Sequence, residues 1–186
     1  MTYPPDIQNL FDIYYGDNPN LRRIVTLHSE NVAKKALQIY KSKNLELNPD
    51  DILYAALLHD IGVVKCNAPD IFAFGSAPYI QHGILGKEIL VKHGFDLFSS
   101  VCTNHTGAGI TLEEIIKNNL PLPHINMVPV TLLEKLICYA DKFYSKSKNL
   151  FYEKSIDEVI SQLKRFGEDS VKRFLELHAL FGDTNK

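Results

Sequence analysis

The fold is decided by residues 48–62, which read NPDDILYAALLHDIG. Asn48 is a typical N-cap residue, Pro49 suits the first helical position, and the two acids that follow suit the positive end of a helix dipole. From Ala55 to Leu58 the helix is apolar nearly all round, which is typical of a helix buried on every side. We therefore predict a central helix that begins after Asn48 and ends near Gly62.

A histidine and an aspartate, His59 and Asp60, stand at the end of this apolar helix. A charged carboxylate buried there is costly unless it is paired with another charge or bound to a metal. The pair also has a structural explanation, in which Asp60 caps a neighbouring helix and His59 makes a hydrogen bond in the core. Taken alone, the pair leaves both explanations open.

Helical periodicity extends over nearly the whole chain, so we expect an all-α protein. The residues between Cys66 and Tyr79 show no clear period, and we expect a loop there that could cover a site. A single domain is expected for residues 1–186, with a core at about 21–146 and a C-terminal helical segment at about 155–182, bent at Gly167. Helices are expected at about 21–39, 80–93 and 96–105, and after capping boxes at Thr111 with Glu114, Thr131 with Glu134 and Ser155 with Glu158.

The composition is that of a globular protein of 186 residues, with 45% hydrophobic and 23% charged residues. The formal net charge of −2 argues against broad electrostatic binding of nucleic acid or of an anionic membrane. No stretch is long and apolar enough for a transmembrane helix, and no secretory signal is recognisable after Met1. The three cysteines form no pattern of disulfides, so a cytoplasmic location is expected.

Four further residues that can bind metals lie on the predicted helices. His28 lies on the apolar stripe of the helix at 21–39, and Asp141 lies in a largely apolar helix. His82 begins one helix, and His105 ends another. Because each buried ionisable group would otherwise need its own partner, we interpret the set as one metal site. Imidazole and carboxylate ligands together suit iron, manganese, zinc, cobalt or nickel.

The order His28, His59-Asp60 and Asp141 resembles the H…HD…D signature of the HD-domain superfamily of metal-dependent phosphohydrolases. Residues 59–62 are similar to its HDIG variant, and the resemblance extends from about Leu21 to Lys146. The two extra histidines, His82 and His105, resemble the subset that binds two metals. That subset includes HD-GYP cyclic dinucleotide phosphodiesterases and bacterial diadenosine tetraphosphate hydrolases. The resemblance implies an HD-type helical bundle.

The resemblance also implies a role for each residue of the set. One divalent ion would be bound by His28, His59, Asp60 and Asp141, and Asp60 would bridge to a second ion that His82 and His105 also bind. A hydroxide between the two ions would be the nucleophile, because metal binding lowers the pKa of water toward neutrality. The implied activity is hydrolysis of a nucleotide or another small phosphoester.

Several residues outside this set are candidates for contact with the substrate. Many HD-GYP proteins have a lysine directly after HDIG, where this chain has Val63, and Lys65 follows two positions later as a candidate catalytic residue. Lys142 and Lys146 could bind a phosphate, or they could be solvated positions at a helix end. Thr106 and Gly107 could offer backbone N–H groups to a phosphate, or they could simply end a helix. The expected partner is a small phosphorylated molecule, and a homodimer is compatible with the sequence.

Two other functions use the same six ligands. Some HD-fold proteins are mixed-valence di-iron oxygenases with the same order of ligands, and sequence spacing does not separate them from hydrolases. A third hypothesis is a sensor that binds a metal or a nucleotide without catalysis, although a bridged pair of metals is more than such a sensor requires.

Overall fold

A computed structural model describes residues 2–146 and 149–182 of the chain. The described residues form an all-α fold, as predicted, with one small antiparallel hairpin in which Asn67 pairs with Phe74 and Ala68 with Ala73. In chain order the elements are α1 (Pro5–Tyr15), α2 (Pro19–Lys43), α3 (Pro49–Leu58), η1 (Ile61–Lys65), β1 (Asn67–Ala68), η2 (Pro69–Ile71), β2 (Ala73–Phe74), η3 (Tyr79–Gln81), α4 (His82–Lys92), α5 (Asp96–Asn104), α6 (Leu112–Lys117), α7 (Leu132–Asp141), α8 (Ile156–Leu163), η4 (Lys164–Phe166) and α9 (Glu168–Phe181), where η marks a 3-10 helix.

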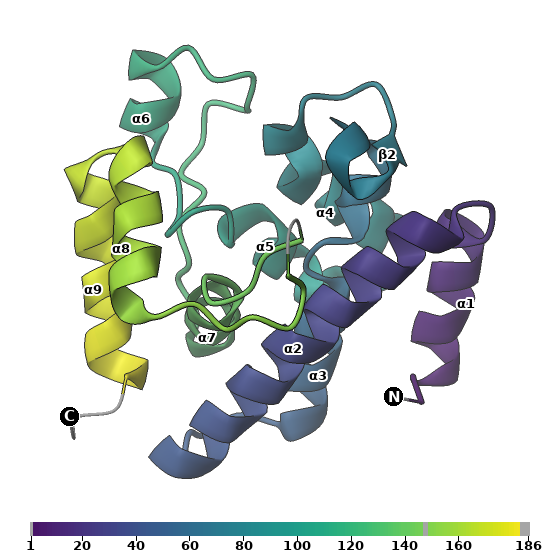
Figure 1. Cartoon of the computed structure of the whole chain (residues 1–186), viewed down its shortest axis with the longest axis horizontal. Helices are drawn as coiled ribbons and strands as arrows, with labels where there is room; N and C mark the ends of the chain where they lie inside the picture. The colour runs from purple at the N-terminus through teal and green to yellow at the C-terminus, as the bar shows by residue number, and fades with distance from the viewer. Residues whose placement is uncertain (1, 147–148, 183–186) are drawn as a thin grey trace.

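Helix α3 lies at the centre of the bundle, as its apolar sequence predicted. It packs against α2, α5 and α7, and its residues from Ala55 to Leu58 are fully buried. Figure 1 shows α1 at one end of the molecule and the pair α8 and α9 at the other. The predicted start of α3 is confirmed, because the side chain of Asn48 accepts a hydrogen bond of 2.9 Å from the N–H of Asp50.

Three glycines bring α4 unusually close to its neighbours. A Cβ at Gly62 would lie only 2.0 Å from the carbonyl oxygen of His82 and 2.3 Å from the nitrogen of Gly86. A Cβ at Gly83 would lie 2.4 Å from the carbonyl oxygen of Cys102 on α5. The lack of side chains therefore lets α4 pack directly on η1 and α5, with His82 beside the end of α3.

The residues between Cys66 and Tyr79 are more ordered than the expected loop. They contain β1, η2, β2 and the start of η3, and α4 begins at His82 rather than at about residue 80. Strands of two residues are too short to show an alternating pattern in the sequence, which explains why they were not predicted.

The capping boxes at Thr111 and Ser155 are present in full, with both reciprocal hydrogen bonds. At Thr131 only half of the box forms, because the carboxylate of Glu134 instead accepts hydrogen bonds from the N–H of Val130 and from the side chain of Asn104. The predicted bend at Gly167 separates η4 from α9, and its φ of 106° favours glycine. Within the described residues, no helix combines the length and apolarity needed to cross a membrane.

Candidate metal centre

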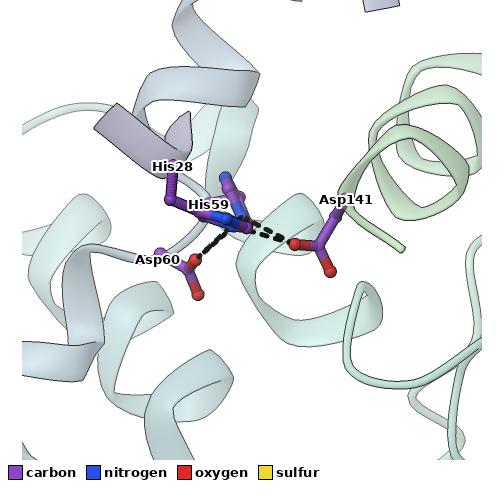
Figure 2. Close-up of side chains that lie close together, drawn as sticks. All are labelled: His28, His59, Asp60 and Asp141. Atoms are coloured by element: carbon purple, nitrogen blue, oxygen red, sulfur yellow. Dashed lines mark hydrogen bonds and ion pairs between the residues drawn. The ribbon is translucent and has the colours of Figure 1, made fainter. Parts of the chain in front are cut away.

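Six histidine and aspartate side chains converge in the middle of the bundle, and each is at least nine-tenths buried. They come from five separate places in the chain, so only the folded structure brings them together. His28 lies in the middle of α2, His59 and Asp60 directly follow α3, His82 is the first residue of α4, His105 directly follows α5, and Asp141 is the last residue of α7. Figure 2 shows four of these side chains turned toward one another.

The first group consists of His28, His59, Asp60 and Asp141. The Nε2 atom of His28 lies 2.9 Å from Oδ1 of Asp141 and 3.2 Å from Oδ2 of Asp60. The Nε2 atom of His59 lies 2.9 Å from the same Asp60 oxygen. Two imidazole nitrogens and two carboxylate oxygens thus point to one spot.

The second group consists of His82, His105 and the other oxygen of Asp60. The Nε2 atoms of the two histidines lie 3.0 Å apart. Each is close to Oδ1 of Asp60, at 3.6 Å from His82 and 3.5 Å from His105. Asp60 therefore offers Oδ2 to the first group and Oδ1 to the second, which is the arrangement of a bridging ligand.

The approach of His82 to His105 supports a cation at the second group. Nδ1 of His82 lies 2.7 Å from the carbonyl oxygen of Tyr79, and Nδ1 of His105 lies 3.1 Å from that of Val101. Because these nitrogens donate to the carbonyls, both neutral rings turn an Nε2 lone pair toward each other. Two such lone pairs repel at 3.0 Å, whereas two nitrogens that bind one ion at ~2.1 Å lie roughly 3.0–3.4 Å apart.

The surroundings of Asp60 also fit bound metal. Within the described part of the chain, neither carboxylate oxygen of this fully buried residue accepts a hydrogen bond of good geometry. Its contacts are ionic instead, and the closest is with Nζ of Lys146 at 2.6 Å from Oδ2. A buried carboxylate normally accepts hydrogen bonds or binds a metal. The mixed imidazole and carboxylate set therefore fits divalent transition metals.

The protonation states of the cluster suit metal binding. Burial alone would raise the pKa of Asp60, but the positive charges of His59 and Lys146 outweigh it and lower that pKa well below its usual value. Burial and the nearby His105 lower the pKa of His82 to about 3. Burial opposes a charge on His59 too, yet Asp60 and Asp141 raise its pKa to about 9. A proton on His59 and a divalent ion would thus balance the same excess of negative charge.

A cavity of about 810 Å³ adjoins this cluster, and His82, His105 and Asp141 form part of its wall. Acidic side chains are fewer on its wall than basic ones, and Glu114 is paired with Arg173 at 2.8 Å. The space is large enough for a molecule the size of a nucleotide. The basic residues on its wall are Lys142, Lys146, Lys154, Arg165 and Arg173.

The model of the HD-domain family matches residues 25–145, a range that includes all six residues of the cluster. The chain belongs to the HD-domain family.

The known proteins that are similar to this HD domain include one uncharacterised protein and two that are named methyltransferases. An uncharacterised protein of Methanocaldococcus jannaschii is 34% identical over 166 residues, which is 82% of this chain and 88% of that protein. Two proteins named tRNA (cytidine(56)-2′-O)-methyltransferase also match. That of Thermoplasma volcanium is 31% identical over 94% of this chain and 46% of its own length, and that of Picrophilus torridus is 32% identical over 85% and 42%. The chain thus spans less than half of both methyltransferases. No solved structure matches it.

The four substrate contacts predicted from the sequence all lie on the cavity wall of this HD domain, and they are Thr106, Gly107, Lys142 and Lys146. Lys142 and Lys146 are largely buried, rather than solvated at a helix end, and Nζ of Lys142 lies 2.7 Å from Oδ2 of Asp141. Oγ1 of Thr106 is buried and has no hydrogen-bond partner among the described residues.

Lys65 is not brought to the cluster or to the cavity wall. Its side chain is exposed, and Nζ lies 5.8 Å from the centre of the Tyr14 ring on α1. Within the 3-10 turn η1, Val63 is buried and Lys65 is exposed, so Lys65 does not take the place that its position after HDIG suggested. The ammonium group next to Asp60 belongs to Lys146 instead.

The cavity wall also contains residues that were not among the predicted contacts, and Tyr79 and Lys154 are two of them. Tyr79 precedes His82 by three residues, accepts its Nδ1 hydrogen bond and stacks on its ring with the centroids 4.9 Å apart. Its position three residues before His82 in the sequence could have indicated that Tyr79 lies beside the metal cluster. Lys154 reaches the cavity from the segment before α8, and no local sequence pattern distinguishes it from the other lysines of the chain.

Proposed function

We propose that this HD domain is a metal-dependent phosphohydrolase that acts on a nucleotide or another small phosphoester, with two divalent ions bound by the six clustered residues. The observation that supports it most is the position of Asp60, which offers one oxygen to each of two ligand groups. The charged side chains on the wall of the cavity beside them are mostly basic, which suits a phosphorylated substrate.

Bound metals would supply an activated water and would neutralise charge on the phosphoryl oxygens. Side chains of the protein would bind and orient the phosphate. Lys142 and Lys146 now pair with Asp141 and Asp60, and Lys142 also donates to the carbonyl oxygen of His105 at 3.0 Å. Ions bound to the two carboxylates would release both ammonium groups from these ion pairs and make them available to the phosphate. Thr106, whose hydroxyl lacks a partner among the described residues, would donate a hydrogen bond to a phosphoryl oxygen.

The basic residues of the wall favour this hydrolase over an oxygenase with the same ligands that acts on a neutral polyol, and oxygen consumption separates it from one that acts on a phosphonate. A neutral polyol would gain nothing from Lys142 and Lys146, and burying those ammonium groups against it would be costly. Phosphate oxygens instead form charge-assisted hydrogen bonds with them.

The methyltransferase relatives do not change this proposal. They are more than twice as long as the region shared with this chain, so we propose that methyl transfer belongs to their remaining part. The shared region would be a hydrolase unit there as well. The names of these relatives specify a tRNA substrate, and RNA is therefore included in the test below.

The test is phosphate release by protein loaded separately with Mn²⁺, Fe²⁺, Co²⁺ or Mg²⁺. The panel contains nucleotides, dinucleoside polyphosphates, simple phosphomonoesters and short RNAs with terminal phosphates. Asp60→Asn is the control, because it keeps the shape of the side chain and removes the charge that both ligand groups share. Release that depends on metal and disappears in the control is expected. Silence across the panel, with iron retained and oxygen consumed, would replace the hydrolase with the oxygenase. Silence with metal bound and no oxygen consumed would favour the sensor.

A further inference from the structure

Three lysines on the cavity wall differ in how their charges are balanced. Lys142 is paired with Asp141 and Lys146 with Asp60, at 2.7 Å and 2.6 Å. Lys154 donates instead to the neutral side-chain oxygen of Gln162, at 3.0 Å. No carboxylate of the described residues forms an ion pair with it. Among the described residues, Lys154 is therefore a cation at the cavity wall that forms no direct ion pair, although the charges of Asp141 and Glu158 act on it.

The segment that contains Lys154 is held firmly in place. The backbone N–H of Lys154 donates to the carbonyl of Phe143 at 2.9 Å, just beyond the end of α7. The preceding residue, Glu153, forms an ion pair of 2.5 Å with Lys35 of α2 and accepts a hydrogen bond of 2.8 Å from Tyr144. The backbone of Lys154 is therefore fixed before a ligand binds, which lowers the entropy that its side chain loses on binding.

The charge on Lys154 is costly in the absence of an anion. Its side chain is mostly covered by neighbours, and this burial is the main cause that lowers its pKa to about 8. The carboxylates of Asp141 and Glu158 oppose this lowering, and the ammonium groups of Lys142 and Lys146 add to it, so that the pKa stays below its usual value. An anion placed beside Lys154 would remove this cost and would gain a charge-assisted hydrogen bond.

The wall around Lys154 has the features of a separate binding place. Arg165 of η4 lines the same cavity and makes no ion pair with a described carboxylate, whereas Arg173 is held by Glu114. Phe166 lies at the same wall with 69% of its surface exposed, so an apolar surface adjoins the cations. These residues come from η4 and the segment before α8, at or beyond residue 154, whereas the metal ligands come from earlier in the chain.

We propose that Lys154, positioned by Gln162, binds a second phosphoryl group of the substrate while the first lies at the metal cluster. The substrate class is then a diphosphate or a bisphosphate rather than a simple phosphomonoester. This inference rests on the proposed function, because it assigns the first phosphoryl group to the metal site.

The test is isothermal titration of metal-loaded protein, freed of excess ion, with inorganic phosphate, pyrophosphate and tripolyphosphate. The proteins compared are the wild type, Lys154→Met and Lys154→Arg. Lys172→Met on α9 is the matched control, since it removes the same charge from an exposed lysine that does not line the cavity. Metal content is measured after each titration to exclude removal of the ion by the ligand.

For the wild type we expect at least one of the two polyphosphates to bind about tenfold or more tightly than phosphate, as one additional charged hydrogen bond allows. Lys154→Met should lose most of this preference and keep the wild-type affinity for phosphate, and Lys154→Arg and Lys172→Met should retain the preference. An unchanged preference in Lys154→Met would overturn the second subsite. An equal loss of affinity for all three anions would also overturn it, because Lys154 would then act on the first phosphoryl group or on the overall electrostatic potential of the cavity.

The titration separates this inference from the proposed function, because it needs no turnover. If no substrate is hydrolysed but Lys154→Met still loses the preference for polyphosphate, the subsite stands and the hydrolase fails. If hydrolysis occurs and the preference is absent, the hydrolase stands and the subsite fails. Where turnover is found, Lys154→Met should raise KM for substrates with two phosphoryl groups and leave KM for phosphomonoesters unchanged.

Discussion

Replacement of Gly62 by alanine tests how the fold builds the second half of the metal site. Gly62 follows Asp60 by two residues, and a Cβ there would lie 2.0 Å from the carbonyl oxygen of His82 and 2.3 Å from the nitrogen of Gly86. Ordinary contact begins at about 3.4 Å, so the start of α4 must retreat by about 1.4 Å. His82 would move with it, away from Asp60.

The cost follows from the kind of atoms that clash. Overpacking in a core costs typically about 1–3 kcal/mol, and here the upper end is expected because both partners are backbone atoms that cannot rotate away. For a domain of this size 1 kcal/mol corresponds to roughly 2–4 °C in Tm. Gly62→Ala should therefore lower the Tm of the metal-free protein by roughly 6–12 °C.

Thermal unfolding followed by circular dichroism measures the loss of stability, and metal titration measures the binding of the second ion. Gly94→Ala is the matched control, because Gly94 has a φ of 77° but open space around its Cβ position, at the end of α4 opposite to His82. Strain at that residue should cost only about 1 kcal/mol. Gly62→Ala should weaken the binding of the second ion, and Gly94→Ala should bind both ions as the wild type does. A Gly62→Ala protein that melts within about 2 °C of the wild type and binds metal normally would refute the packing argument.

Three further predictions concern the charges and caps around the site. Lys146→Met should lower the Tm of the metal-free protein more than that of the metal-loaded protein, because the ammonium group compensates the buried Asp60 only when no ion does; equal losses in two melting curves would contradict this. In urea unfolding of the metal-free protein, the free energy of unfolding should fall as the pH falls from about 6.5 toward 3. The reason is that His82 is protonated over this range in the unfolded protein but stays neutral in the folded protein, where its pKa is about 3. His82→Gln should show a shallower fall, and an identical slope would contradict the lowered pKa of His82. Ser155→Ala removes the hydroxyl that caps α8 and should cost about 1 kcal/mol by chemical denaturation, and no measurable loss would mean that Glu158 alone holds this end.

The metal ligands could be predicted from the sequence because charged or imidazole side chains are rare on apolar helices. His28 and Asp141 were distinctive for that reason, and His59-Asp60 ended the most apolar helix of the chain. The pairing of each ligand with one of two groups came from the family resemblance, and the distances agree with it.

The outer wall of the cavity could not be predicted in the same way. Lys154 looks like any other lysine before a capping box, and its place depends on how the segment before α8 attaches to α7 and α2. Lys65 was predicted at the site because of its distance from HDIG along the chain, but the 3-10 turn η1 points it outward. Helix α1 was also not anticipated, since its apolar residues Ile7, Leu10 and Phe11 gain their meaning only by packing on the rest of the bundle.

Anomalous diffraction from crystals grown with Mn²⁺ tests most directly the claim that these six residues bind two ions. We expect two peaks that share Asp60, one bound also by His28, His59 and Asp141 and the other by His82 and His105. The ammonium group of Lys146 should then have moved off the Asp60 carboxylate. A single peak, or none, with Lys146 still paired to Asp60, would contradict the dinuclear site.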